Sequence, residues 1–166
     1  ALATAAATAA ADLDRRITTR FGAHGYPREL GGQAHDAALT MLMPPFRRTP
    51  PGAELLAAWR LAQGELRRPA GGLAPGGDWR RDGVSWTPET ALFALTAAGT
   101  GQHEVAAGWL DWLDAHRTAA GSLAEKVQAN GQPAAVAPLA WSAALVVLAV
   151  EAQGRKPPVL RHHGLT

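Results

Sequence analysis

Apolar side chains recur at helical spacing along six stretches of the chain, and no stretch shows the sustained alternation of apolar and polar residues that a strand requires. In the first stretch, Leu13, Ile17 and Phe21 follow one another at every fourth position. The spacing predicts helices over residues 4–21, 35–43, 52–68, 103–119 and 138–152, and a further helix that begins at Thr87 and continues through Leu95. The sequence therefore predicts an all-α protein.

Two of these helices have distinctive features. Thr87 is expected to be the N-cap of its helix, with Pro88 as the first helical residue, because a hydroxyl side chain and a proline are favoured at those two positions. The stretch 138–152 is apolar nearly all round. A helix without a polar face is expected to be buried.

The order of the helices points to stacked helical hairpins. The first, third and fifth helices carry charges along one side, whereas the second, fourth and sixth are more apolar or begin beside glycine and proline. Such an alternation of outer and inner helices is the repeating unit of a toroid. The connections from outer to inner helices, residues 22–34, 69–85 and 121–137, are long and rich in glycine. Connections of this length are commonly functional, so we expect them to form a cleft at one end of the toroid.

The composition excludes several classes of protein. The chain has no cysteine, which excludes disulfide scaffolds, zinc–cysteine sites and cysteine nucleophiles. Its formal net charge is only +2 with scattered arginines, so nucleic acid is not an expected partner. The longest apolar run, residues 143–150, is too short to span a bilayer, so no membrane partner is expected. His162 and His163 lack a third ligand at suitable spacing, so neither a metal nor another cofactor is expected.

Three blocks of sequence resemble a known family of enzymes. The segments SLAEKV (122–127), GQP (131–133) and APLAWSA (137–143) are similar to the closing segment of the glucoamylase-type inverting α-glycosidases, glycoside hydrolase family 15. The block DWRRDGVSW (78–86), which leads into a helix, resembles that family's D-x-x-x-x-G-x-x-W pattern, and residues 21–45 look like an earlier hairpin of the same family. The order and spacing of the blocks support the resemblance.

The resemblance implies a fold and an activity. Members of that family fold as (α/α)6 toroids, and the three predicted hairpins of this chain correspond to about half of one. Residues 1–153 are accordingly expected to be the C-terminal half of such a catalytic domain, followed by a tail with proline and histidine over residues 154–166. The implied activity is hydrolysis of α-glucosidic bonds in an oligosaccharide or polysaccharide, with inversion at the anomeric carbon.

Glu125 matches the general base of the family. It lies in a connection flanked by glycine, and the adjacent Lys126 favours the ionised carboxylate that a base requires. The family's general acid lies on an earlier loop, and no residue here matches its context, so the acid is expected upstream, in the N-terminal remainder of the domain. The carboxylates nearest the expected cleft, none of which is assigned as the acid, are Asp82, Asp78, Glu29 and Asp36.

The resemblance also implies substrate-binding residues. Asp78 and Trp86 fall where the family places groups around its glucose pocket, Trp79 is a candidate for stacking on a sugar ring, and Asp82 is a neighbouring carboxylate. Two alternatives stay open at this point. Asp78 is equally compatible with a turn aspartate after two glycines, and Trp86 with an apolar anchor at the start of its helix.

Two other functions are compatible with the same scaffold. The chain could be a non-catalytic carbohydrate-binding or interaction protein. It could also be another α/α-toroid enzyme, although no Asp-rich helix supports a terpene cyclase, and only Tyr26 with His24 supports a polysaccharide lyase. Whatever its function, a chain that forms half a toroid leaves the apolar flanks of its inner helices uncovered at the two open edges. The chain alone is therefore expected to form a homodimer, to pair with its missing half, or to be marginally stable.

Overall fold

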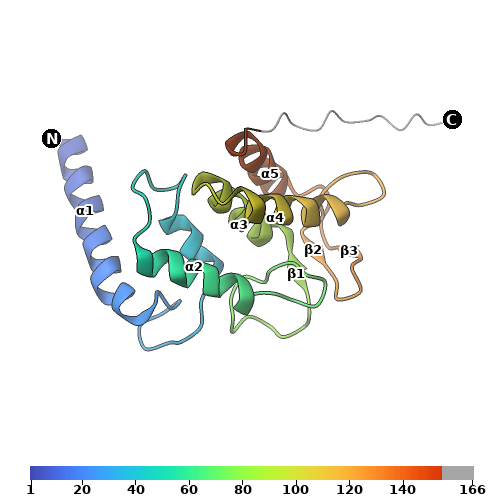
Figure 1. Cartoon of the computed structure of the whole chain (residues 1–166), viewed down its shortest axis with the longest axis horizontal. Coiled ribbons are helices and arrows are strands. Elements are labelled where there is room, and N and C mark those ends of the chain that lie inside the picture. Colours follow the sequence, from blue (N-terminus) through green and yellow to red (C-terminus); the bar gives the residue numbers. More distant parts are fainter. Residues whose placement is uncertain (155–166) are drawn as a thin grey trace.

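The computed structural model describes residues 1–154 and confirms the all-α class (Figure 1). The predicted tail, with His162 and His163, falls almost entirely outside the described residues. The α-helices are α1 (Leu2–Arg20), α2 (Ala53–Glu65), α3 (Thr87–Gly99), α4 (His103–Ala115) and α5 (Ala140–Ala152). Two 3-10 helices, η1 (Gly22–His24) and η2 (Ala37–Leu42), follow α1, and three two-residue strands are β1 (Ser85–Trp86), β2 (Lys126–Val127) and β3 (Pro133–Ala134). No helix of residues 1–154 has the length and apolar character needed to cross a membrane.

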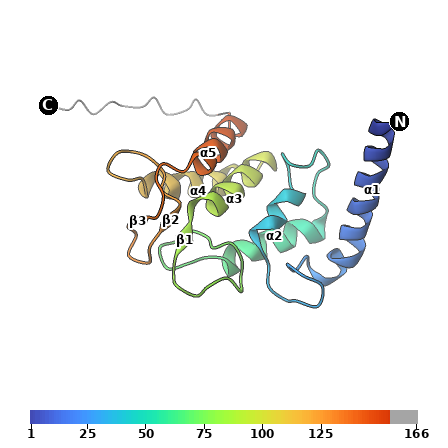
Figure 2. The same cartoon turned by 180° about the vertical axis from the view of Figure 1, so that it is seen from behind.

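Helix α3 is the centre of the fold. It packs closely against both α4 and α5, as the views from the two sides show (Figures 1 and 2). Of its residues, only Glu89 and Gly99 are not fully buried. Helix α2 reaches α3 through Trp59, which stacks on Phe93 with 5.8 Å between the ring centroids and donates its indole N–H to Thr96 Oγ1 at 3.0 Å. A helix surrounded in this way must be apolar or have its polar side chains hydrogen-bonded, and the buried hydroxyl groups of Thr87, Thr90 and Thr96 each donate to a carbonyl oxygen.

Three of the predicted helix boundaries are wrong. The second predicted helix is the short 3-10 helix η2, in which Asp36 Oδ1 accepts the N–H of Ala38 at 2.8 Å and the chain leaves helical geometry before Pro44. Thr87 is inside α3 rather than its N-cap, because its hydroxyl bonds outward to the carbonyl oxygen of Ala124 at 2.6 Å. Helix α4 ends at Ala115 instead of continuing to residue 119, where Thr118 and Ser122 close a turn.

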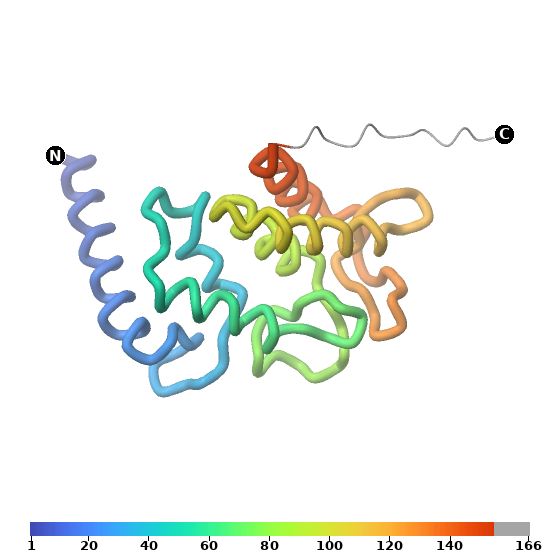
Figure 3. Tube along the Cα trace, viewed as in Figure 1, coloured from blue at the N-terminus to red at the C-terminus, as the bar shows by residue number. Residues whose placement is uncertain are grey.

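The expectation that the last helix is buried holds for one side only. Leu145 and Ala149 of α5 are buried against α3, whereas Trp141, Val147 and Leu148 are about half exposed, at 52%, 58% and 49%. Helix α1 has no buried residue and stands apart from the other helices, near them only at its C-terminal end (Figures 1 and 3). Apolar side chains of α1 and α5 therefore remain uncovered by residues 1–154.

Two glycines offer a matched test of the packing between the second connection and α4. A Cβ on Gly72 would lie 2.4 Å from a ring carbon of Trp112 and 2.9 Å from Cβ of Ser85, whereas a Cβ on Gly64, in α2, would meet nothing within 4 Å. We expect Gly72→Ala to lower the free energy of unfolding by about 1–3 kcal/mol because the site is already filled. Gly64→Ala should raise it by up to about 1 kcal/mol, since alanine is the better helix former. Urea unfolding of the two variants checks this, and equal effects would contradict the described packing.

Candidate active site

The three glycine-rich connections meet at the N-terminal end of α3. The first is joined to the second by hydrogen bonds from Ala37 N to Pro75 O (2.8 Å) and from Gly77 N to His35 O (2.9 Å). The second continues into β1, which pairs with β2 of the third connection in an antiparallel sheet of order β1-β2-β3. The sequence predicted that these connections lie at one end but not that short strands join them. Figure 3 shows the connections after α1 and α2 at the same end of the molecule.

The backbone of Glu125 is fixed on both sides. Its N–H donates to Val136 O at 2.8 Å, and its carbonyl accepts the N–H of Thr87, the first residue of α3, at 3.0 Å. The Thr87 hydroxyl also contacts Ser142 Oγ of α5 at 2.7 Å, and both of those side chains are buried. The loop that carries Glu125 is therefore tied to the start of α3 and to α5.

The side chain of Glu125 lies beside a cation and remains accessible to solvent. Its Oε2 is 3.7 Å from Lys126 Nζ, and the two side chains are 30% and 32% exposed. The same Lys126 Nζ lies 4.2 Å from the centroid of the Trp86 ring, in cation–π geometry. Lys126 thus connects the Glu125 carboxylate to the aromatic residue that precedes α3.

Two tryptophans form the aromatic part of the site. Trp79 and Trp86 meet edge to face, with 6.0 Å between the ring centroids and 89° between their planes. The indole N–H groups of both are buried and have no hydrogen-bond partner among the described residues. Buried polar groups usually have a partner, so two unpaired donors in one place indicate a site where polar groups of another molecule can bind.

Glu89, on the first turn of α3, adds a second carboxyl group near that of Glu125. Burial is the largest of the effects that raise its pKa to about 7; the negative charges of Asp36 and Glu125 act in the same direction, and a backbone hydrogen bond opposes them. Its Oε2 is buried without a hydrogen-bond partner among the described residues. Desolvation therefore outweighs the favourable helix N-terminus, and the carboxyl group is protonated through much of the acidic range.

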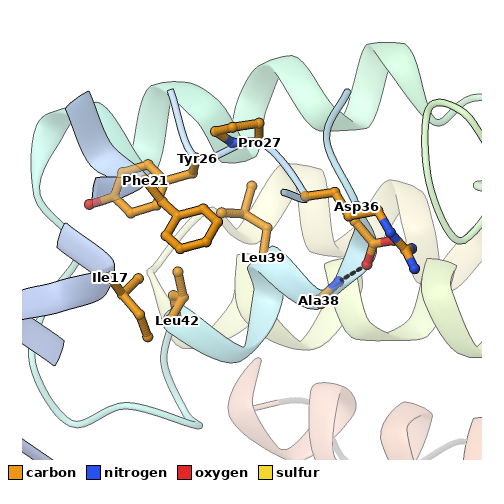
Figure 4. A pocket seen from close by; sticks show the side chains of 9 residues that line it. Ile17, Phe21, Tyr26, Pro27, Asp36, Ala38, Leu39 and Leu42 are labelled. Atoms are coloured by element: carbon orange, nitrogen blue, oxygen red, sulfur yellow. Dashed lines mark hydrogen bonds and ion pairs between the residues drawn. The ribbon is translucent and has the colours of Figure 1, made fainter. Parts of the chain in front are cut away.

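Asp36, the N-cap of η2 just after the first connection, brings a third carboxyl group. Its side chain forms an ion pair with Arg28, and its Oδ1 accepts the N–H of Ala38 at 2.8 Å. It also borders an open pocket of about 410 Å³ between the end of α1 and η2. Figure 4 shows Asp36 at one edge of that pocket and apolar side chains on the other side. These apolar side chains are Ile17, Phe21, Leu39 and Leu42.

The structure brings together some of the predicted site residues and not others. Glu125, Trp79 and Trp86 lie around the N-terminal end of α3. Asp78 is exposed and lines a separate open groove with Glu65, Arg68 and Arg81 among others. Asp82 is exposed, and its carboxylate accepts the N–H of Val84 at 3.0 Å, which closes a turn. No described contact joins Asp78 or Asp82 to Glu125.

Sequence reasoning assigned no role to Glu89. The available signal was a single carboxylate in the first turn of a helix that is otherwise apolar, three residues after Trp86. A charged residue there normally complements the helix dipole, so the pattern alone does not indicate a site. Among residues 1–154 no group of three or more potential ligands could hold a metal ion, and the site consists of carboxyl groups, one ammonium group and two indoles.

The protonation of Glu89 predicts a pH dependence of stability. Because its pKa is raised from 4.5 to about 7 on folding, its buried carboxyl favours the folded state fully below pH 4.5, and this contribution declines as pH rises to about 7. The change is on the order of 3 kcal/mol. We expect Glu89→Gln to flatten this decline, so that the variant gains stability relative to the wild type between about pH 5 and pH 7. Unfolding by urea across that range measures it, and parallel pH curves for the two proteins would contradict it.

Comparisons with known proteins give structural relatives only. No protein-family model and no curated protein matches the chain. Among solved structures, a wild-type glycosidase superposes with a TM-score of 0.69 at 25% identity, over 89% of this chain and 44% of its own. A variant of a glycosidase with one glutamate replaced by alanine superposes with a TM-score of 0.70 at 25% identity and the same coverage.

A further glycosidase variant, with glutamate replaced by alanine and in complex with glucose, superposes with a TM-score of 0.69 at 24% identity over 89% of this chain and 44% of its own. The chain therefore spans less than half the length of the solved structures that it resembles.

Proposed function

We propose that this chain supplies the general base and part of the sugar pocket of an inverting glycosidase that acts on α-glucosidic bonds, similar to the glucoamylases. The observation that carries this proposal is the setting of Glu125, whose backbone is bonded on both sides and whose carboxylate lies beside Lys126 and an aromatic pair. The similarity to solved glycosidases, one of them in complex with glucose, supports it.

The proposed chemistry needs a carboxylate that can take a proton from water. Inversion requires one carboxyl group to protonate the leaving oxygen while a second removes a proton from a water molecule on the opposite face of the sugar, roughly 6.5–9.5 Å away. Glu125 is partly exposed, so a water molecule can reach its carboxylate. The adjacent ammonium group of Lys126 favours the charged form before proton transfer, and the negative charges of Glu125 and Asp36 favour the positive charge that develops on the sugar.

The general acid is proposed to come from the remainder of the domain. The solved glycosidases are more than twice as long as the part that this chain matches. Helix α1 has no buried residue, and the outer side of α5 is exposed, so both could pack against such a remainder. A second copy of the chain could cover the same apolar surfaces instead.

The substrate-binding residues predicted from the sequence remain part of the proposal. Trp86 and Trp79 offer apolar ring surface and two unpaired N–H groups, although Lys126 covers one face of Trp86. Asp78 and Asp82 are proposed to accept sugar hydroxyl groups from their exposed positions in the second connection. Carboxylates suit this role because each oxygen can accept from a hydroxyl.

A non-catalytic carbohydrate-binding protein is the second candidate. One observation favours it: the aromatic pair of Trp79 and Trp86 lies beside carboxyl groups, and such an arrangement can bind a sugar without a general acid. In this alternative the aromatic pair and the carboxyl groups would bind a sugar that is never cleaved.

Hydrolysis of a panel of α-glucosides by the full-length gene product tests the proposal, with the configuration of the released sugar followed by NMR. The expected result is cleavage of at least one α-linked glucoside with β-glucose as the first product, and no cleavage of β-linked controls. Release of α-glucose first would contradict inversion. Sugar binding without any cleavage would favour the second candidate.

A further inference from the structure

We propose that Glu89 is a further substrate-binding residue, whose carboxyl group exchanges a hydrogen bond with a hydroxyl group of an uncharged sugar at the N-terminal end of α3. This inference rests on the proposed function, because it assigns a residue to the same site. It goes further by naming a contact that neither the sequence pattern nor the comparisons assign.

Position is the first argument. Glu89 is one of only two α3 residues that are not fully buried, and it lies on the turn to which Glu125 is hydrogen-bonded through Thr87. Trp86 is one helical turn earlier, with Trp79 against it. The negative charges of Asp36 and Glu125 are close enough to raise the pKa of Glu89, so carboxyl groups from three separate segments of the chain lie near this point.

The cations near the site are already engaged, which is the second argument. Arg28 pairs with Asp36, and Lys126 lies against Glu125 and the Trp86 ring. No described ion pair includes Glu89, and its Oε2 is buried without a donor. A carboxyl group in such a position holds a proton more readily than its neighbours do.

The proton decides what Glu89 can bind. A neutral carboxyl group offers one O–H donor and acceptor capacity, which matches a sugar hydroxyl because that group also donates and accepts. An ionised carboxylate could only accept. The negative charges of Asp36 and Glu125 also repel anions, so the site should favour an uncharged sugar over a uronic acid or a sugar phosphate.

The test compares glucose binding by the full-length gene product and three variants. Glu89→Leu removes the polar group, Glu89→Gln keeps a donor and an acceptor without a charge, and Glu104→Leu is the matched control because Glu104 lies in the first turn of α4. Calorimetry with glucose at pH 5 should show the dissociation constant raised at least about tenfold in Glu89→Leu, and changed less than about threefold in Glu89→Gln and in the control.

A pH profile separates direct binding from a structural role. Wild-type affinity for glucose should fall as pH rises through about 7, where Glu89 loses its proton, and the fall should be absent in Glu89→Gln. Should Glu89→Leu fail to fold, this comparison decides alone. Unchanged affinity in Glu89→Leu, or identical pH profiles for wild type and Glu89→Gln, would overturn the assignment.

The outcomes also separate this inference from the proposed function. Loss of hydrolysis in Glu125→Gln, with glucose affinity unchanged in Glu89→Leu, would retain the glycosidase and reject Glu89. If the wild type binds glucose but cleaves nothing, and Glu89→Leu binds glucose more weakly, the role of Glu89 in sugar binding is supported and the hydrolase is rejected. A wild type that neither binds glucose nor cleaves any α-glucoside would reject both.

Discussion

Glu125→Gln is expected to lower the rate of α-glucoside hydrolysis by the full-length gene product by about 10²–10⁴-fold, the usual contribution of a general base. Glutamine has nearly the same shape but cannot take a proton from water. Because the loop is held by backbone hydrogen bonds of Glu125 and by Thr87, the substitution should leave the loop in place. The effect should therefore fall on kcat far more than on KM.

The matched control for this substitution is Glu29→Gln. Glu29 is an exposed glutamate in the first connection, and no ion pair among the described residues includes it. Its replacement should change the rate by less than about twofold. Hydrolysis that is equally fast in wild type and Glu125→Gln would remove Glu125 from the mechanism, whatever the structural similarity to glycosidases.

Trp59→Ala should cause the largest loss of stability among single substitutions in the core, about 3–5 kcal/mol in the free energy of unfolding. Trp59 is fully buried, stacks on Phe93, and donates its indole N–H to Thr96 Oγ1. Its removal leaves a cavity between α2 and α3, and Thr96 Oγ1 loses the indole donor while it keeps its own bond to the Leu92 carbonyl oxygen. Since α3 carries Glu89 and holds the loop of Glu125 through Thr87, the same variant should lose activity at lower temperatures than the wild type.

Urea unfolding followed by circular dichroism measures this effect. Leu61→Ala is the control, because Leu61 is on the same helix but 66% exposed, and surface substitutions usually change stability by less than about 0.5 kcal/mol. Trp59→Phe should fall between the two, since it keeps an aromatic ring and loses the hydrogen bond. Equal stability of Trp59→Ala and Leu61→Ala would contradict the described contact between α2 and α3.

The helices could be predicted well from the sequence where local pattern decides the structure. The spacing of Leu13, Ile17 and Phe21 located α1 to within two residues at each end, and α2 is also close to its predicted range. The predictions that were wrong, the N-cap at Thr87 and the full burial of α5, concern features that depend on contacts between distant segments. The hydroxyl of Thr87 bonds to the third connection rather than capping its own helix, and an apolar helix such as α5 is covered only where another element packs on it.

The candidate site was only partly predictable for the same reason. Glu125 and Trp86 stand in sequence blocks that resemble a family, and the structure brings their segments together through β1 and β2. Asp36 and Glu89 are 53 positions apart in the sequence, and their closeness to Glu125 arises from the way the connections pack. No pattern of residues along the chain encodes the burial that keeps a proton on Glu89.

The crystal structure of the full-length gene product with bound glucose tests the proposed site most directly. The proposed site predicts a glucose ring at the N-terminal end of α3, with a water molecule between its anomeric carbon and the Glu125 carboxylate and a hydroxyl group within hydrogen-bond distance of Glu89. Glucose bound away from the second and third connections, with Glu125 in contact with neither the sugar nor such a water molecule, would contradict it.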